Sequence, residues 1–206
     1  MTDSVSIVAA GYDAIASRYL AWGEQITDDP KLAYLAELDG RLADGSHIVD
    51  LGCGAGTPTC ELLAHRHTVL GVDVSGEQIR LARSRVPAAR FEQRDLTALD
   101  LPSGSLDAVI ALYSLIHVPR ERHADLLVRI RSWLRPGGLL LATFGTGVSD
   151  GVQDDFLGVA MYFSSFDVAV GRRLVLDAGF TLVHDDEVTI HEPSGPVRFL
   201  WILARA

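Results

Sequence analysis

The stretch from Val49 to Thr57, Val-Asp-Leu-Gly-Cys-Gly-Ala-Gly-Thr, constrains the fold of this chain more than any other. A short apolar run leads into it and is typical of a buried strand. Gly52, Gly54 and Gly56 follow at every second position, and Thr57-Pro58 then opens a helix as N-cap and first helical residue. A strand, a glycine turn and a helix form the first half of a nucleotide-binding βαβ unit. Glycines are needed because the ligand lies against bare backbone, which a Cβ would block.

The spacing of the glycines, together with an acid before them, indicates which ligand the turn binds. Dinucleotide-binding folds use G-x-G-x-x-G and aim a helix N-terminus at a pyrophosphate. Here the third glycine comes one residue early, and Asp50 lies at the strand end just before the turn. An acid at this place suits a ligand ammonium group better than a phosphate. The stretch resembles the first motif of the class I S-adenosylmethionine-dependent methyltransferases, acid-x-G-x-G-x-G. The alternative is a tight turn in an NAD-type Rossmann domain.

Two further acids follow at the ends of later strands. Asp73 lies 21 residues beyond Gly52, where a carboxylate can accept hydrogen bonds from both hydroxyls of a ribose. NAD enzymes use the same arrangement, so Asp73 indicates adenosine binding without separating the two families. Ser75, with Gln78 three residues later, predicts a capping box for the next helix. The resemblance implies that Asp95 in Asp95-Leu96 accepts from the adenine amino group, while the next backbone N–H donates to the ring.

A second motif, Leu134-Arg135-Pro136-Gly137-Gly138, precedes the apolar strand 139–144. Proline and two glycines supply a helix stop and a compact reversal, and in this family an L-x-P-G-G turn precedes the fifth strand. The resemblance covers nearly the whole chain and implies S-adenosyl-L-methionine as the cofactor. The cofactor-binding residues expected from it are Tyr19, Asp50, Gly52, Cys53, Gly54, Asp73, Val74, Asp95, Leu96, Ala111 and Leu112.

A helical pattern near the N-terminus carries aromatic residues on one face. Within the helix predicted for 7–22, three- and four-residue steps connect Tyr12, Ile15, Ala16, Tyr19 and Trp22. Aromatic side chains on one face of a helix usually pack into the hydrophobic core. The segment from Tyr12 to Tyr19 also resembles the Y-D-x-x-A-x-x-Y stretch that precedes the glycine motif in small-molecule methyltransferases. That resemblance implies a cofactor contact for Tyr19 and a substrate-side wall for Tyr12.

One histidine is the candidate catalytic residue. His117 follows the predicted fourth strand, at the sheet edge where ligands bind in open α/β folds. It is expected to act as general base or to orient the substrate; a histidine hydrogen-bonded in the core is the alternative. Tyr113, Met161 and Tyr162 are weaker candidates for the substrate pocket. The stretch 145–166, loop-like and then aromatic, is expected to form a substrate lid or, equally, a packing insert.

The length and the pattern predict one domain. A chain of 206 residues can bury a sizeable core. The resemblance implies an α/β, Rossmann-like sheet of seven strands in the order 3-2-1-4-5-7-6, the last strand antiparallel, flanked by helices. The domain 1–206 would divide into an N-terminal helical cap (1–44), a cofactor-binding core (46–145), a substrate-lid insert (146–166) and a C-terminal helix and hairpin (167–206).

The charge and the composition of the chain limit the kinds of molecule that it is expected to bind. A net charge of −9 disfavours nucleic acid and anionic membranes, and we find neither a membrane-spanning run nor a signal sequence. Two cysteines, both near the glycine turn, favour a reducing cytoplasm. Cysteines, histidines and acids do not occur in metal-ligand spacing, so no metal is expected. The expected partner is a small-molecule acceptor, and the chain is a monomer or a homodimer.

The leading hypothesis is therefore methyl transfer from S-adenosylmethionine to an O or N atom of a small molecule, in an in-line displacement. Three alternatives remain at this point. The same fold can bind the cofactor and catalyse a reaction other than methylation. An NAD-dependent oxidoreductase fits the glycine spacing poorly. A binding module that has lost catalysis is disfavoured by the intact set of acids and glycines.

Overall fold

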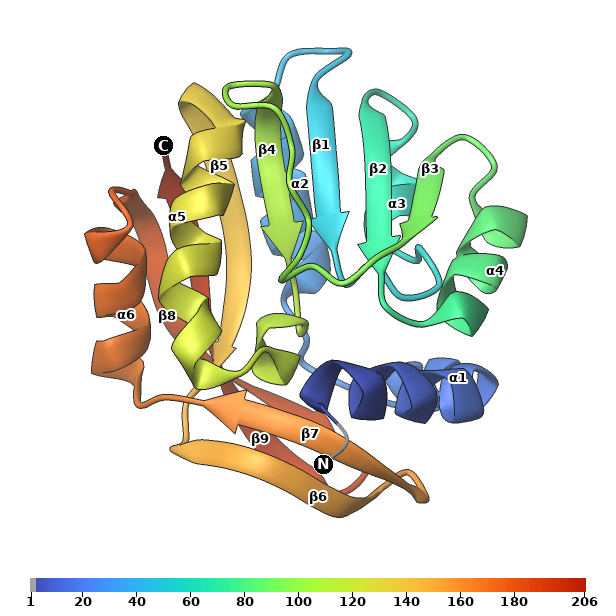
Figure 1. Ribbon diagram of the computed structural model, residues 1–206. Coiled ribbons are helices and arrows are strands. Elements are labelled where there is room, and N and C mark those ends of the chain that lie inside the picture. Colours follow the sequence, from blue (N-terminus) through green and yellow to red (C-terminus); the bar gives the residue numbers. More distant parts are fainter. Residues whose placement is uncertain (1–2) are drawn as a thin grey trace.

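A mixed seven-stranded sheet forms the centre of the computed structural model, which describes residues 3–206 (Figure 1). Its strands run in the order β3-β2-β1-β4-β5-β9-β8. The first five are mutually parallel, and β9 is antiparallel to both β5 and β8. Without the separate pair β6 and β7, this is the predicted order 3-2-1-4-5-7-6, so the predicted fold class is confirmed. The strand bounds are β1 His47–Leu51, β2 Thr68–Asp73, β3 Arg90–Gln93, β4 Leu106–Ala111, β5 Leu134–Gly145, β8 Thr181–Glu192 and β9 Gly195–Arg205.

Helices cover both faces of the sheet. Helices α5 (His123–Trp133) and α6 (Val168–Asp177) lie on the near face in Figure 1, and α2 (Lys31–Gly40) and α3 (Thr59–Leu63) lie behind it. Helix α4 (Gly76–Arg85) packs beside β2 and β3. Because both faces are covered, the central strands are almost continuously buried and apolar. Within residues 3–206 we find no helix with both the length and the apolarity to cross a membrane.

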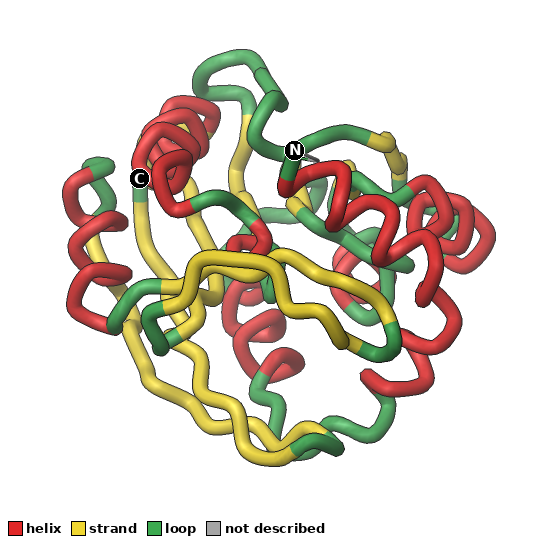
Figure 2. The backbone as a smooth tube through the Cα atoms, turned by 60° about the horizontal axis from the view of Figure 1, so that its bottom comes forward, coloured by secondary structure: helices red, strands yellow, loops and turns green. Residues whose placement is uncertain are grey.

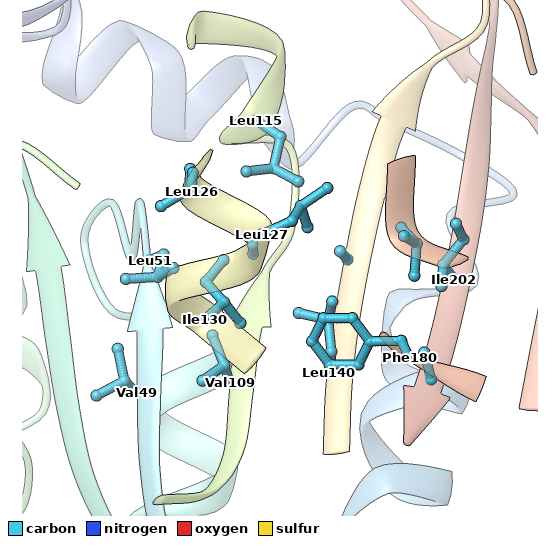
Figure 3. Packing of buried hydrophobic residues seen from close by; sticks show 14 of the residues in the cluster. Val49, Leu51, Val109, Leu115, Leu126, Leu127, Ile130, Leu140, Phe180 and Ile202 are labelled. Atoms are coloured by element: carbon cyan, nitrogen blue, oxygen red, sulfur yellow. The ribbon is translucent and has the colours of Figure 1, made fainter. Parts of the chain in front are cut away.

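The core under α5 joins this helix to the middle of the sheet. Side chains of α5 point between those of β1, β4 and β5 (Figure 3). The side chains of this cluster are almost completely buried. The labelled members of this cluster are Val49, Leu51, Val109, Leu115, Leu126, Leu127, Ile130, Leu140, Phe180 and Ile202. This packing fixes the carboxyl ends of the strands, which carry the site.

The N-terminal helix and a hairpin close the carboxyl end of the sheet. Helix α1 (Ser4–Gly23) lies below the strand ends in Figure 1, and β6 (Ser149–Phe156) pairs antiparallel with β7 (Val159–Ser165) beside it. Figure 2 shows the hairpin lying across this end of the molecule. The expectation of a loop-like stretch at 145–166 is therefore wrong. Strand β6 is exposed on both sides and so lacks the alternation by which a strand is recognised.

Helix α1 and the hairpin pack as one unit. A Cβ placed on Gly11 would lie 2.7 Å from the Cε atom of Met161, so β7 approaches the helix backbone directly. The Arg18 guanidinium donates to the carbonyl of Leu157 at the hairpin tip. The predicted cap and insert thus pack together over the sheet.

Two local predictions need correction. The helix expected to begin at Thr57 and Pro58 begins at Thr59 instead, and this helix, α3, is only five residues long. The five residues from Leu134 to Gly138, predicted as a turn, are the first part of β5. The register of β4 on β5 shifts between Leu106 and Ala108, where this segment enters the sheet.

We expect Leu127→Ala to lower the free energy of unfolding by about 2–5 kcal/mol, because the side chain is fully buried between α5 and the sheet. The neighbouring variant Val128→Ala is the control. Its side chain is 54% exposed, and a surface change of this kind stays within about 0.5 kcal/mol. Urea unfolding measures both, and equal losses would contradict the packing described.

Candidate functional site

The turn after β1 presents bare backbone to the carboxyl end of the sheet. The N–H groups of Gly52 and Cys53 donate to the Val72 carbonyl at 2.7 and 3.0 Å, which ties the turn to β2. Gly52 has a φ of +77°, and a Cβ there would lie 2.3 Å from the Cβ of Ser114. A side chain at this position would both strain the backbone and collide with the segment after β4.

Asp73, the last residue of β2, braces the same turn. Its Oδ2 accepts from the Gly54 N–H and its Oδ1 from the Ser75 N–H, both at 2.9 Å. Burial raises the pKa of this carboxyl above its ordinary value. Each carboxylate oxygen can accept a further hydrogen bond. Asp73 can therefore receive two ligand hydroxyls while it holds the turn.

A cavity of about 150 Å³ lies over this turn. Of the residues predicted to bind the cofactor, all but one line it: Tyr19, Asp50, Gly52, Cys53, Gly54, Asp73, Val74, Asp95, Leu96 and Leu112. Ala111 is not among the described lining residues, because its side chain is buried within β4. Asp95 holds its own loop, since its carboxylate accepts from the N–H and the hydroxyl of Thr97 at 2.7 Å each.

The carboxylate of Asp50 and the ammonium group of Lys31 face the same cavity. Asp50 is 3% exposed and accepts from the Cys60 thiol at 3.3 Å. Burial raises the pKa of Asp50 to about 7, and the nearby Lys31 ammonium offsets part of that rise. Lys31, in the first turn of α2, lies 3.5 Å from the Asp29 carboxylate. Lys31 was not among the residues predicted from the sequence. The signal for it is the helix start at Asp29-Pro30, which places this residue at the edge of the sheet.

Two buried polar side chains on the cavity wall lack a partner within the described part of the chain. They are the Gln78 amide and the Ser114 hydroxyl. The predicted capping box is only half formed, because the Ser75 hydroxyl accepts from the Gln78 N–H at 3.1 Å while the Gln78 side chain does not return the bond. Buried polar groups are normally satisfied, so these atoms indicate a polar ligand. The analysis of the sequence did not single out either side chain as a site residue.

His117 lies at the edge of this cavity with both ring nitrogens engaged. It ends a short 3-10 turn, η1 (Leu115–His117), and a second one, η2 (Arg120–Arg122), leads into α5. The His117 Nδ1–H donates to the Tyr162 carbonyl at 2.7 Å, because a carbonyl only accepts. In neutral His117, Nε2 therefore accepts from the Tyr12 hydroxyl at 2.8 Å. Burial lowers the pKa of His117 to about 4, so the imidazole is neutral at pH 7.

A second, larger cavity of about 910 Å³ adjoins the first. Tyr12, Tyr19 and Tyr113 line both. The second cavity is walled by aromatic side chains of α1 and the hairpin, among them Phe156 and Phe163.

Two predicted substrate residues lie elsewhere. Met161 and Tyr162 are not among the described residues that line either cavity. Met161 is fully buried under α1. The Tyr162 hydroxyl donates to Asp150 of β6 at 2.5 Å. Neighbouring residues of a strand point to opposite sides, and Phe163 rather than Tyr162 faces the cavity.

Comparisons with known proteins agree with this site. Residues 48–138 match a family model described as a methyltransferase domain. An O-methyltransferase, cnsE, of Penicillium expansum is 33% identical over 153 residues, 68% of this chain and 54% of that protein. A trans-aconitate 2-methyltransferase of Methylobacterium nodulans is 38% identical over 128 residues, 61% and 47% of the two chains. The solved DhpI–SAH complex superposes with a TM-score of 0.69 at 25% identity, over 98% of this chain and 96% of that one.

The glycine turn, the acids at the strand ends, the sheet order and these matches lead to one family. The fold and the site are those of the class I S-adenosylmethionine-dependent methyltransferases, whose cofactor is S-adenosylmethionine, and residues 48–138 match the methyltransferase domain model. The NAD-dependent alternative is thereby set aside. The chain spans about half the length of the curated relatives it matches.

We expect cofactor affinity to fall below pH 7. A ligand ammonium at Asp50 requires the ionised carboxylate, and the free protein holds the pKa of Asp50 at about 7. Binding then releases a proton at acidic pH, and affinity falls by up to about tenfold per pH unit below 7 while it levels off above. Calorimetry in two buffers of different ionisation enthalpy measures that proton. Asp50→Asn should bind the cofactor weakly at every pH. If the affinity of the wild-type protein stays unchanged between about pH 5 and pH 8, the assignment of the ligand ammonium to Asp50 is contradicted.

Proposed function

We propose that this chain transfers a methyl group from S-adenosylmethionine to an O or N atom of a small-molecule acceptor. The observation that carries the proposal is the pair of adjoining cavities. A small cavity whose lining includes Asp50, Asp73 and Asp95 lies over the glycine turn. A larger one, lined in part by aromatic side chains, adjoins it across Tyr12, Tyr19 and Tyr113. A transfer enzyme needs two such sites that share a boundary, because donor and acceptor must meet in line.

The side chains of the smaller cavity fit the cofactor group by group. Asp50 suits the ammonium of its amino-acid end, and Lys31 the carboxylate. Asp73 suits the two ribose hydroxyls, because both of its oxygens can accept again. Asp95 suits the adenine amino group. The orphaned Gln78 amide supplies a further donor and acceptor.

When bound, S-adenosylmethionine supplies an activated methyl group on a sulfonium. What the chain must add is alignment of the acceptor, exclusion of water and, for a hydroxyl or ammonium acceptor, removal of a proton. Five aromatic rings at the cavity boundary form a closed circuit of contacts, with centroid separations from 4.8 to 6.4 Å. These rings, which exclude water there, are those of Tyr12, Tyr19, Phe156, Phe163 and His117.

The tautomer of His117 supports a role for this residue as the base. Its Nε2 is already occupied by the Tyr12 hydroxyl, so an acceptor proton reaches the imidazole through Tyr12. The acceptor proton goes to the Tyr12 oxygen while the Tyr12 proton moves to Nε2 of His117. Burial holds the pKa of Tyr12 well above its ordinary value, which disfavours a free phenolate and favours movement of both protons together. The proton then resides on Nε2 of His117, and the resulting imidazolium keeps its Nδ1–H bond to the Tyr162 carbonyl.

The net charge of −9 supports a small-molecule acceptor over nucleic acid. Cys53 and Cys60 are both free and buried, which supports a cytoplasmic location. Both a monomer and a homodimer are compatible with this function, because the two cavities are lined by one chain.

The test is a mass-spectrometric screen of pooled small molecules with S-adenosylmethionine. We expect one pool member to gain a CH2 unit while S-adenosylhomocysteine forms in equal amount. In the same assay His117→Ala should lower kcat by about 10²–10⁴-fold. Tyr12→Phe should lower it similarly, and the double variant no further, because the two act as one relay.

A product of unchanged mass, formed without S-adenosylhomocysteine, would replace methylation by another reaction on the same fold. Full turnover by His117→Ala at every pH would remove the histidine from the mechanism. The control is His123→Ala. His123 is buried, and its ring nitrogens lie 3.2 and 3.1 Å from the carbonyl oxygens of Pro119 and Leu115, so its loss should change stability more than kcat.

A further inference from the structure

A half-buried carboxylate, that of Glu192, lies in the wall of the larger cavity. It ends β8, and its one hydrogen bond within the described residues comes from the Ser194 hydroxyl at 3.4 Å. None of the ion pairs found within residues 3–206 includes it. Desolvation of a carboxylate costs free energy unless a cation compensates it. A ligand can supply that cation.

The backbone around Glu192 is fixed. Thr27, in the linker between α1 and α2, and His191 exchange two backbone hydrogen bonds of 3.0 Å. The carboxylate of Asp28 adds a contact of 2.9 Å to the His191 ring. The end of β8 is thereby locked to the N-terminal cap, so Glu192 faces the cavity as part of a rigid wall.

The cations of this cavity are already neutralised or lie at its outer edge. Lys31 pairs with Asp29 at 3.5 Å and is the residue assigned above to the cofactor carboxylate. Arg198 lies 3.7 Å from Glu187. Arg85 is exposed at the end of α4. An anionic acceptor would have to compete with existing ion pairs for these groups. A cationic one finds an acid without a counter-charge.

Aromatic rings line the same cavity as this acid. Trp22 stacks on Tyr19 with ring centroids 5.5 Å apart, and Trp22 and Phe156 meet in a T-shaped contact with centroids 5.9 Å apart. The Glu192 charge adds to the effect of burial in raising the pKa of Tyr12, Tyr19 and Tyr113, so the carboxylate acts across the boundary between the two cavities. Aromatic faces attract cations and flat apolar rings alike.

We infer that the acceptor is a flat aromatic ring with an alkylamine side chain, whose ammonium group binds Glu192 while its ring lies among Trp22, Phe156 and Phe163. The inference rests on the proposed function, because it names the substrate class of the same site. Glu192 is here a specificity-determining residue. It requires no new chemical step, since it binds the acceptor by a charge-assisted hydrogen bond.

The test measures binding to the protein saturated with S-adenosylhomocysteine, using three probes of equal ring system: tryptamine, tryptophol and indole-3-propionate. They differ only in carrying an ammonium, a hydroxyl or a carboxylate. We expect tryptamine to bind tightest and indole-3-propionate weakest. Glu192→Gln should weaken tryptamine by about tenfold or more, as loss of a charge-assisted hydrogen bond does, and leave tryptophol unchanged.

The matched control is Glu61→Gln, which removes the same charge from an exposed position of α3. It should change none of the three affinities. The inference is overturned if indole-3-propionate binds tightest, if none of the probes binds, or if Glu192→Gln leaves tryptamine unaffected. Calorimetry with S-adenosylhomocysteine alone separates this failure from failure of the proposed function. If S-adenosylhomocysteine still binds and the screen finds a neutral acceptor that is methylated, the proposed function holds and only the inference of an amine acceptor is wrong.

Discussion

The structure depends on the hydrogen bonds that hold bare backbone against the end of β2. Gly52 and Cys53 bind the Val72 carbonyl, and Gly54 binds the Asp73 carboxylate. These bonds fix the glycine turn at the point where β1 leaves the sheet, and a Cβ at Gly52 would collide with Ser114. The turn therefore decides both the close approach of a ligand and the packing of the segment after β4, which carries His117.

The second constraint is the closure of the site by the α1–hairpin unit. Gly11 allows Met161 to lie directly on the helix, so Phe156 and Phe163 are brought over the sheet edge from a hairpin far along the chain. The same packing places Tyr12 against His117. The two cavities thus share one aromatic boundary, at which the Tyr12 hydroxyl donates to the neutral His117 ring.

Much of this was predictable from local sequence, because glycine spacing, caps and apolar runs are local signals. The sheet order and the cofactor cavity residues follow from them. The hairpin was not, because β6 is exposed on both sides and its acids and glycines match a loop. The burial of Met161 depends on Gly11, about 150 positions away, and the roles of Lys31 and Glu192 depend on which elements surround them. Such long-range contacts leave no periodic trace in one sequence.

The central claim is that the cavity over the glycine turn binds S-adenosylmethionine. Calorimetric titration of the purified protein with S-adenosylhomocysteine and with NADH tests it most directly, with Asp73→Ala beside the wild type. We predict that S-adenosylhomocysteine binds saturably, that Asp73→Ala loses this binding, and that NADH gives no heat. If NADH binds and S-adenosylhomocysteine does not, the cavity is not a site for S-adenosylmethionine.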